Sequence, residues 1–493
     1  MTSKYSNNII YIAVLLCIAV VSYSAPKPKE NRMDRLVSEI LAPLKKIGSK
    51  KYTPKSVSDY STLTTTGTWT EVHPSGNVKV SAKIWTKAIQ AALDENKSVY
   101  IPYTGEPYYI DAPLVIKSGC SLKVDPNAEI RLRPGINTCM LRNEHQVGGQ
   151  EGAVDLPSDC DKDIVIEGGI WTTLATTVNE SNGNVNGGPD SNNALHGHGV
   201  ILMNRVRQVW VKNLVIKESR PHGVQFCNAT EFLVENIQFV DHRRDGVHIN
   251  GPASYGVIRN VRGVTGDDMI ALNAWDWKNT VMTFGPIHHM LVEKVDAGIS
   301  TSDFRAEIRF LGGTKHYPDG KTLDCDIENC VVRDIKGIRT FKMYDQPNLE
   351  LGRDNDFADP IGNFSNLYFS KLFIDNSFES TFQIGSNVDG MAIDDVTLAF
   401  PTPAPYFKLV QIGPPSMTIK MDPSNPATWV EVFSPDKDNT VRNFKLTNLK
   451  ELKGKDTVEL KASDYVNVIT QKINTDYPNS VPKGGTGKGI LVP

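Results

Sequence analysis

Three carboxylates stand just before short apolar strands in the segment 245–272. Asp245 precedes one strand, and the adjacent pair Asp267 and Asp268 precedes the next. If the two strands occupy successive coils of a parallel β-helix, Asp245 stacks against the pair. Like charges brought that close raise each other's pKa, which favours one protonated acid beside one ionised base. Hydrolysis of a glycosidic bond needs that combination, although three clustered acids also suit a calcium ion.

The strands that must position these acids form a loose repeat from residue 163 onward. Each unit is a short alternating strand that ends in Asn or a substitute and is followed by a second apolar strand. A base period near 23 residues with insertions is typical of a right-handed parallel β-helix, whose coils bury their apolar faces against each other. Hairpin signals such as Asn-Gly are largely absent, which disfavours a β-sandwich. The anchor residues, chosen because Asn tolerates left-handed geometry, are Asn213, Asn236, Asn260, Lys294, Asn329, Lys371 and Asp395.

The second strand of each unit predicts a ladder of functional side chains. Because side chains alternate between the two faces of a strand, the residues between the inward apolar ones point outward. Acids would lie in the middle of this face with cations beside them, and Arg binds a carboxylate such as that of a uronic acid bidentately. The outward ladder is Gln225, His248, Ala271, Arg309, Lys342 and Gln383, and the strand starts are His222, Asp245, Asp268 and Ala306, with Asp267, Arg305 and Glu307 adjacent.

Two tryptophans follow the acid pair directly. Trp275 and Trp277 would be exposed beside the cleft, where an aromatic ring stacks on a sugar ring; packing under a loop is the alternative interpretation. We expect no cofactor and assign no metal ligand, because no histidine has metal-ligand spacing. The candidate catalytic residues are Asp245, Asp267 and Asp268, and the candidate substrate-binding residues are His222, His248, Arg305, Glu307, Arg309, Lys342, Trp275 and Trp277.

The N-terminus has the pattern of a cleaved export signal. Lys4 precedes an apolar run over residues 9–21, and Ser22 and Ser24 occupy the −3 and −1 positions of a cleavage site after residue 24. The 13 apolar residues are short for a membrane span of about 20 residues, which disfavours a membrane anchor. The sequence therefore predicts a secreted or periplasmic protein with no membrane span after cleavage.

Composition and length limit which partners and which domain organisation we expect. A formal net charge of −3 over 493 residues gives no reason to expect nucleic acid as a partner, and we expect a monomer. We predict an all-β chain: a single-stranded right-handed parallel β-helix with an N-terminal capping helix at 83–97. Its parts are a signal peptide 1–24, a linker or N-terminal extension 25–60, the β-helix domain 61–470 and a C-terminal tail 471–493.

Six cysteines remain after the predicted cleavage. In an exported protein some of them pair, and spacing permits Cys139 with Cys160 or Cys325 with Cys330. Spacing does not decide between such pairs and small, unpaired residues buried in the coils.

The acid motifs resemble glycoside hydrolase family 28, the polygalacturonases and their relatives, within the pectin-lyase-like β-helix group. The resemblance covers roughly residues 80–400 and rests on Asp245-Gly246 one coil before Gly266-Asp267-Asp268. It implies hydrolysis with inversion, in which one Asp protonates the leaving oxygen and the other two activate water. Asp268 or Asp267 would then be the acid, and Asp245 with the remaining Asp the base.

Several positions depart from the family pattern. Arg243-Arg244 stand where the family has Asn-Thr, the family's Gly-His-Gly is missing at 304–307, and Arg339 and Lys342 only echo its Arg-Ile-Lys. The resemblance thus implies a divergent relative acting on a pectin-like or other uronic-acid-containing polysaccharide or oligosaccharide. Two alternatives stay open: a calcium-dependent polysaccharide lyase, in which Arg or Lys abstracts a proton, and a non-catalytic carbohydrate-binding β-helix.

Overall fold

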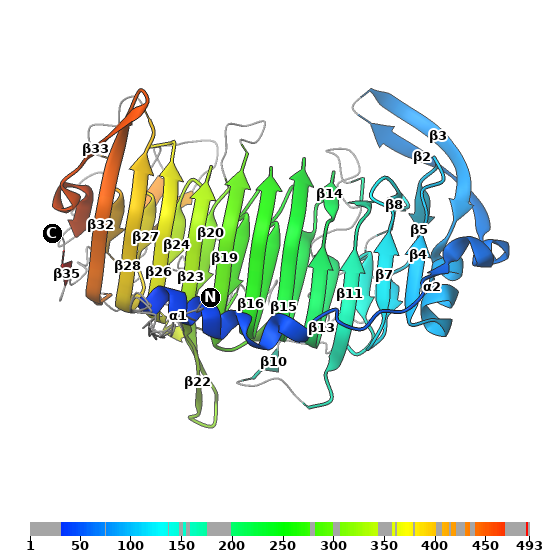
Figure 1. The fold of residues 1–493 in the computed structure, drawn as a ribbon, viewed down its shortest axis with the longest axis horizontal. Coiled ribbons are helices and arrows are strands. Elements are labelled where there is room, and N and C mark those ends of the chain that lie inside the picture. Colours follow the sequence, from blue (N-terminus) through cyan, green and yellow to red (C-terminus); the bar gives the residue numbers. More distant parts are fainter. Residues whose placement is uncertain are drawn as a thin grey trace, which may run out of the picture.

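The chain folds into a right-handed parallel β-helix, as the repeat predicts. In the computed structural model, strands from successive coils pair in parallel along one 28-stranded sheet that runs the length of the molecule (Figure 1). A β-sandwich is excluded, because its strands would pair mainly antiparallel. The structure describes residues 31–73, 75–136, 138–146, 151–153, 158–174, 199–276, 282–298, 306–343, 357–359, 362–377, 380–400, 407–413, 416–420, 429–433, 439–468 and 490–491.

Most central coils contribute one long strand and one short strand, separated by a turn. The long strands stack side by side across the front of the molecule in Figure 1. They are β11 (Asp161–Glu167), β13 (Gly199–Lys212), β15 (His222–Val240), β16 (Val247–Gly263), β19 (Ile287–Ala297), β23 (Ile327–Lys336), β26 (Asn363–Ile374), β28 (Asn387–Leu398) and β32 (Val441–Lys453). The short strands are β12 (Ile170–Thr172), β14 (Val215–Lys217), β17 (Ile270–Asn273), β20 (Ile308–Leu311), β24 (Phe341–Met343), β27 (Phe382–Ile384), β29 (Val410–Ile412) and β34 (Val466–Val468).

The first coils are built from shorter strands, and antiparallel pieces project from the solenoid. A β-hairpin of β2 and β3 extends from the N-terminal end (Figure 1). The N-terminal elements are β1 (Lys55–Ser56), β2 (Thr65–His73), β3 (Gly76–Ile84), β4 (Ser98–Ile101), β5 (Tyr108–Ile110), β6 (Leu114–Ile116), β7 (Ser121–Val124), β8 (Glu129–Leu132), β9 (Leu141–Asn143), η1 (Pro43–Lys46) and η2 (Val57–Leu63). The remaining elements are β10 (Glu151–Gly152), β18 (Thr283–Phe284), β21 (Gly313–His316), β22 (Thr322–Cys325), β25 (Phe357–Asp359), β30 (Ser416–Lys420), β31 (Trp429–Phe433), β33 (Asp456–Glu459), η4 (Ala462–Tyr465) and β35 (Ile490–Leu491).

The Asn-type anchors mark turns with left-handed backbone, which confirms the reason for choosing them. Asn213, Asn236 and Asn260 have φ values of 60°, 55° and 54°, and they share one row of the register. Asn329 also has positive φ, but its assignment to that row was wrong. The register places Asp334 opposite Lys294, whereas Asn329 belongs to a second row of left-handed residues five positions earlier in the coil. Each coil therefore makes two such turns, and one Asn pattern does not distinguish them.

Two helices protect the solenoid at places where strands alone would leave apolar surface exposed. Helix α2 (Thr86–Glu95) lies at the N-terminal end with Ala88, Ile89 and Ala92 fully buried, which confirms the predicted capping helix (Figure 1). Helix α1 (Arg32–Leu41) comes from the predicted linker or N-terminal extension. It lies across the long strands, where Leu36, Val37 and Ile40 pack against Leu233, Val257, Leu291 and Val331 (Figure 1).

The suggested disulfides Cys139–Cys160 and Cys325–Cys330 do not form in the structure. Most of these thiols are buried among apolar side chains, as small core residues would be. In the described part of the chain, no helix is long and apolar enough to cross a membrane. The predicted signal peptide lies outside the described residues, and so does the predicted C-terminal tail apart from 490–491.

Candidate active site

The predicted outward ladder forms with the expected register. Gln225 lies opposite His248, His248 opposite Ala271 and Ala271 opposite Arg309. Lys342 and Gln383 continue the same column in the next coils. The neighbours predicted to point inward lie in the apolar core: Val224, Val247, Ile270, Ile308 and Phe341. Gln225, His248 and Ala271 of the ladder are buried as well, outside that core. Strand alternation therefore brings residues that lie far apart in the sequence into one column facing away from the core.

The three predicted acids meet at the start of β16 and β17. Asp245, Asp267 and Asp268 each place one carboxylate oxygen within 4.8 Å of the others. Asp245 and Asp268 are 5% and 3% exposed, whereas Asp267 is partly exposed. Because a water molecule donates hydrogen bonds of about 2.8 Å, one water can contact two oxygens at this separation.

Asp268 has the features of a proton donor. Burial raises its pKa well above the usual range, and the charges of Asp245 and Asp267 add to this effect although Arg309 opposes it. Nε of Arg309 lies 2.9 Å from Oδ2 of Asp268. Oδ1 is buried and has no hydrogen-bond partner among the described residues. The side chain thus has one oxygen fixed by a cation and one oxygen left to carry a proton.

The other two acids differ from Asp268 in their environment. Burial opposes the ionisation of Asp245, but a hydrogen bond and the charge of His248 hold its pKa below the usual range. Burial and the neighbouring Asp245 raise the pKa of Asp267 to about 6. Three carboxylates in one patch are therefore pushed apart in acidity, which is the pattern that divides acid and base roles.

His248 links Asp245 to an acid that the sequence did not single out. Its Nδ1 lies 2.6 Å from Oδ2 of Asp245, and its Nε2 lies 2.8 Å from Oδ2 of Asp276. His222 stacks on the ring of His248 with 4.0 Å between centroids, and its Nε2 is 3.8 Å from Oδ2 of Asp245. His222 and His248, predicted to bind substrate, are 1% and 2% exposed and contact Asp245 instead.

A cluster of cations surrounds Glu307 on the C-terminal side of the acids. Lys342 places Nζ 2.9 Å from Oε2 of Glu307, Arg309 places Nη2 3.5 Å from the same oxygen, and Arg339 pairs with Oε1. Glu307 is 2% exposed, and its pKa is lowered because the three cations outweigh the effect of burial. The structure thus brings the predicted substrate-binding residues Glu307, Arg309 and Lys342 together, and they form ion pairs with one another.

The aromatic prediction fails for Trp275. The ring is 5% exposed and packs edge-on against Phe284 with 4.1 Å between centroids, so it belongs to the core rather than to a sugar-stacking platform. The alternative interpretation, packing under a loop, is the one that fits. Trp277 and Arg305 lie outside the described residues.

Two sets of metal-type donors overlap at this site. One is the acid trio, and the other consists of His222, Asp245 and His248. The two imidazole rings lie nearly parallel, with 14° between their planes, and both nitrogens of His248 already contact carboxylates, those of Asp245 and Asp276. In the acid trio, Arg309 already supplies a positive charge to Asp268. In each set a side chain lies where a metal ion would otherwise compensate a carboxylate: Arg309 beside Asp268 and His248 beside Asp245.

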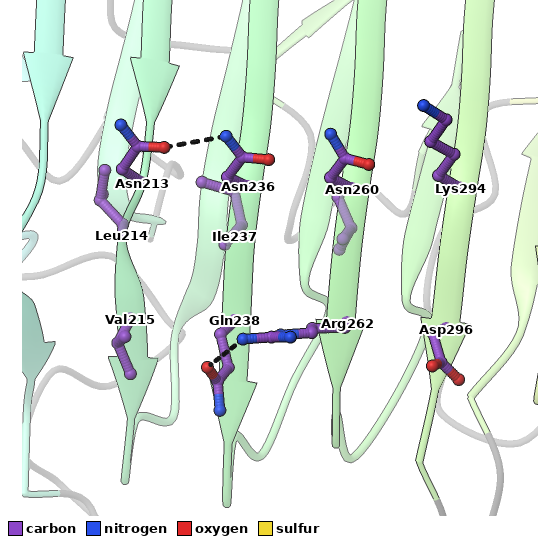
Figure 2. Close-up of a pocket in the computed structure, with 11 residues that line it drawn as sticks. Asn213, Leu214, Val215, Asn236, Ile237, Gln238, Asn260, Arg262, Lys294 and Asp296 are labelled. Carbon is purple, nitrogen blue, oxygen red and sulfur yellow. Dashed lines mark hydrogen bonds between the residues drawn. The ribbon is translucent and has the colours of Figure 1, made fainter.

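A concave region away from the acids lies at the turn row of the anchors (Figure 2). It is a groove of about 490 Å³ that crosses four coils, with a row of amides on one wall. Asn236 donates to Oδ1 of Asn213 at 2.9 Å, and Arg262 donates to Oε1 of Gln238 at 3.2 Å. Its polar side chains are exposed or half-buried, whereas Leu214, Ile237 and Val261 at its floor are buried. The groove contains none of the three acids.

Comparison with known proteins supports the β-helix fold but assigns no activity to the chain. No protein-family model matches the chain, and no curated protein matches it either. An endo-xylogalacturonan hydrolase from Aspergillus tubingensis is similar in structure at 13% identity and a TM-score of 0.43, covering 82% of this chain and 96% of that one. A hyperthermoactive exopolygalacturonase from Thermotoga maritima has 10% identity and a TM-score of 0.43, covering 86% and 95%.

A third structure with a similar fold is a surface adhesin, PfbA of Streptococcus pneumoniae. It has 12% identity and a TM-score of 0.40, covering 82% of this chain and 94% of that one. At such identities these likenesses concern the β-helix alone and assign neither a family nor an activity to the chain.

Proposed function

We propose that the protein is a secreted glycoside hydrolase that cleaves O-glycosidic bonds in a pectin-like or other uronic-acid-containing polysaccharide or oligosaccharide. One observation carries the proposal: a buried acid with a raised pKa, Asp268, lies beside an ionised acid, Asp245, within 4.8 Å. The Asp-Gly and Gly-Asp-Asp motifs, which resemble family 28, support the substrate class. Export rests on the sequence pattern of residues 1–24.

The proposed reaction adds one water across the glycosidic bond. Asp268 donates its proton to the glycosidic oxygen as the bond between that oxygen and the anomeric carbon breaks. Asp245, assisted by Asp267, accepts a proton from water, whose oxygen bonds to the anomeric carbon. Attack from the face opposite the leaving oxygen is what the resemblance to family 28 implies. The products are two sugars, an ionised Asp268 and a protonated base, and exchange of one proton with solvent restores the starting state.

The site favours this reaction over a lyase. A lyase on this fold would need the acids to hold calcium and Arg or Lys to abstract a proton. Burial opposes the charge of Arg309, but Asp268, Asp267 and Glu307 together raise its pKa above the usual value. An Arg with a raised pKa is a poor base, so Arg309 suits charge stabilisation better than proton abstraction.

The test is incubation of the purified protein with a panel of pectic polysaccharides and oligosaccharides, with and without chelator. Reducing ends and the ultraviolet absorbance of unsaturated uronides are followed together. New reducing ends without absorbance, unchanged by chelator and lost in Asp268→Asn, support a hydrolase. Absorbance that disappears with chelator supports the lyase, and sugar binding without turnover supports a binding module.

A further inference from the structure

Both ring nitrogens of His248 face carboxylate oxygens. Nδ1 is 2.6 Å from Asp245 and Nε2 is 2.8 Å from Asp276, and all three side chains are nearly inaccessible to solvent. A neutral imidazole has one N–H and one lone pair, so one of its nitrogens would face a carboxylate with a lone pair. Only the imidazolium donates from both nitrogens. Two carboxylates at these distances favour a charged His248. Nε2 contacts Asp276 as a close ion pair and not as a well-aligned hydrogen bond.

Asp276 is fixed by residues from the neighbouring coils. Nδ2 of Asn250 lies 3.4 Å from Oδ2 of Asp276. The amide of Asn250 is itself oriented, because Gln225 donates to its Oδ1 at 2.9 Å and Cys227 donates to the same oxygen at 3.5 Å. Burial raises the pKa of the Cys227 thiol well above its usual value, which keeps it a donor. A chain of donors thus aims the Asn250 N–H group at Asp276.

The backbone of Asp245 is held as well. His242 is buried, and burial lowers its pKa to about 4, so it is neutral and its Nε2 donates to the carbonyl oxygen of Asp245 at 2.8 Å. The charged groups around Asp245 come from all the strands packed there. The groups that face the pair of Asp245 and His248 are His222 at the start of β15, Arg244 before β16, Asp267 and Asp268 before β17, Asp276 after β17, and Arg309 of β20.

We propose that Asp276 is a positioning residue: through the imidazolium of His248 it orients the carboxylate of Asp245 and keeps that carboxylate ionised. The base role of Asp245 rests on the proposed function, whereas the charge state of His248 does not. Asp276 lies three residues beyond Asn273, the register partner of Asn250, so it reaches His248 from the far end of β17. Removing its charge leaves His248 with one anionic partner in a buried place, which favours the neutral imidazole.

The experiment measures the protonation of His248 by NMR in protein with isotope-labelled histidine, assigned with His248→Gln. In the wild type we expect an imidazolium at pH 8, and in Asp276→Asn a neutral ring at that pH. The matched control is Asp161→Asn, which removes the buried carboxylate 2.8 Å from His145 in an earlier coil and should leave the His248 signal unchanged. A neutral His248 in the wild type, or the same charge in wild type and Asp276→Asn, overturns the proposal.

Kinetics supply the second readout. In Asp276→Asn the acidic limb of the kcat/KM profile should move to higher pH by about 1–3 units, because Asp245 loses its stabilising cation. KM should change little. An unmoved limb overturns the positioning role even if activity falls. The expected NMR result in a protein without hydrolytic activity would instead reject the proposed function and leave the charge state of His248 established.

Discussion

The acid site and the amide-lined groove are built by the same coils, yet they treat polar side chains in opposite ways. In the groove, Asn213, Asn236 and Asn260 are exposed, and Asn236 donates to Asn213 along the row (Figure 2). At the acid site, Asp245 and Asp268 are almost fully buried: His248 compensates the charge of Asp245, and Arg309 holds one oxygen of Asp268. Repetition along a solenoid thus supplies ordered polar rows, and burial of unlike charges is what separates the acidities needed for catalysis.

The largest effect should follow removal of the proposed proton donor. Asp268→Asn cannot protonate a leaving oxygen, so we expect kcat to fall by about 10²–10⁴-fold on the substrate that the panel identifies. Asn is similar in shape and keeps the fold, which circular dichroism checks. Asp161→Asn, a buried Asp outside the trio, should keep wild-type activity. If Asp268→Asn and Asp161→Asn lost equal activity, the assignment of catalysis to the three acids would be contradicted.

Glu307→Gln should give the next largest effect. It leaves Arg309, Arg339 and Lys342 without their shared carboxylate, and we expect a loss of about 3 kcal/mol in the free energy of unfolding. The loss is moderated because the cations reach solvent in part. Urea unfolding measures it. Unchanged stability would mean that the cluster is held by groups other than Glu307.

The buried imidazolium makes stability depend on alkaline pH. Burial opposes the charge of His248, but its two carboxylate partners raise its pKa to about 10, above about 6.5 in the unfolded chain. Its contribution is therefore complete below about pH 6.5 and is lost as pH rises through about 10. The difference in unfolding free energy between wild type and His248→Gln should shrink over this range, by an amount on the order of 3 kcal/mol. A difference that is constant between pH 6 and pH 10 would contradict the charged state.

Asp267→Asn should separate activity from stability. The pKa of Asp267 is raised to about 6, so at pH 7 the folded protein carries a charge that burial and Asp245 disfavour. Removing this charge should slow the reaction and raise the unfolding free energy by about 1 kcal/mol at pH 7. Near pH 4 the gain should vanish, because Asp267 is then protonated in the fold. If Asp267→Asn were less stable than the wild type at pH 7, the proposed repulsion among the three carboxylates would be contradicted.

The smallest effect belongs to the groove. Asn236→Ala removes one amide of the row and places Ala at a φ of 55°, where a side chain other than Asn or Gly is disfavoured. We expect a loss of about 1 kcal/mol in unfolding free energy and no change in hydrolysis. Asn236→Gly, which relieves the backbone but also lacks the amide, should be less affected. Reduced hydrolysis in both variants would show that the two regions are coupled.

Much of the fold and of the acid site could be predicted from the sequence, because the alternation of side chains along a strand and the preference of Asn for turns are local rules. They placed His248, Arg309 and Lys342 in one column and gave the left-handed anchors. They failed for Asn329, since each coil has two such turns, and for Trp275, since a local pattern does not show what lies above a ring. The pairing of Asp276 with His248 depends on how a chain leaves β17, which no periodicity records.

The most direct test of the central claim is the proton count of the acid trio. Carboxyl carbons of isotope-labelled Asp are followed by NMR through pH 7 in the wild type and in the Asn variants of the three acids. We predict one neutral carboxyl at pH 7, lost in Asp268→Asn, beside an ionised Asp245. Three ionised carboxylates at pH 7 would contradict the assignment of Asp268 as the acid and with it the proposed hydrolysis.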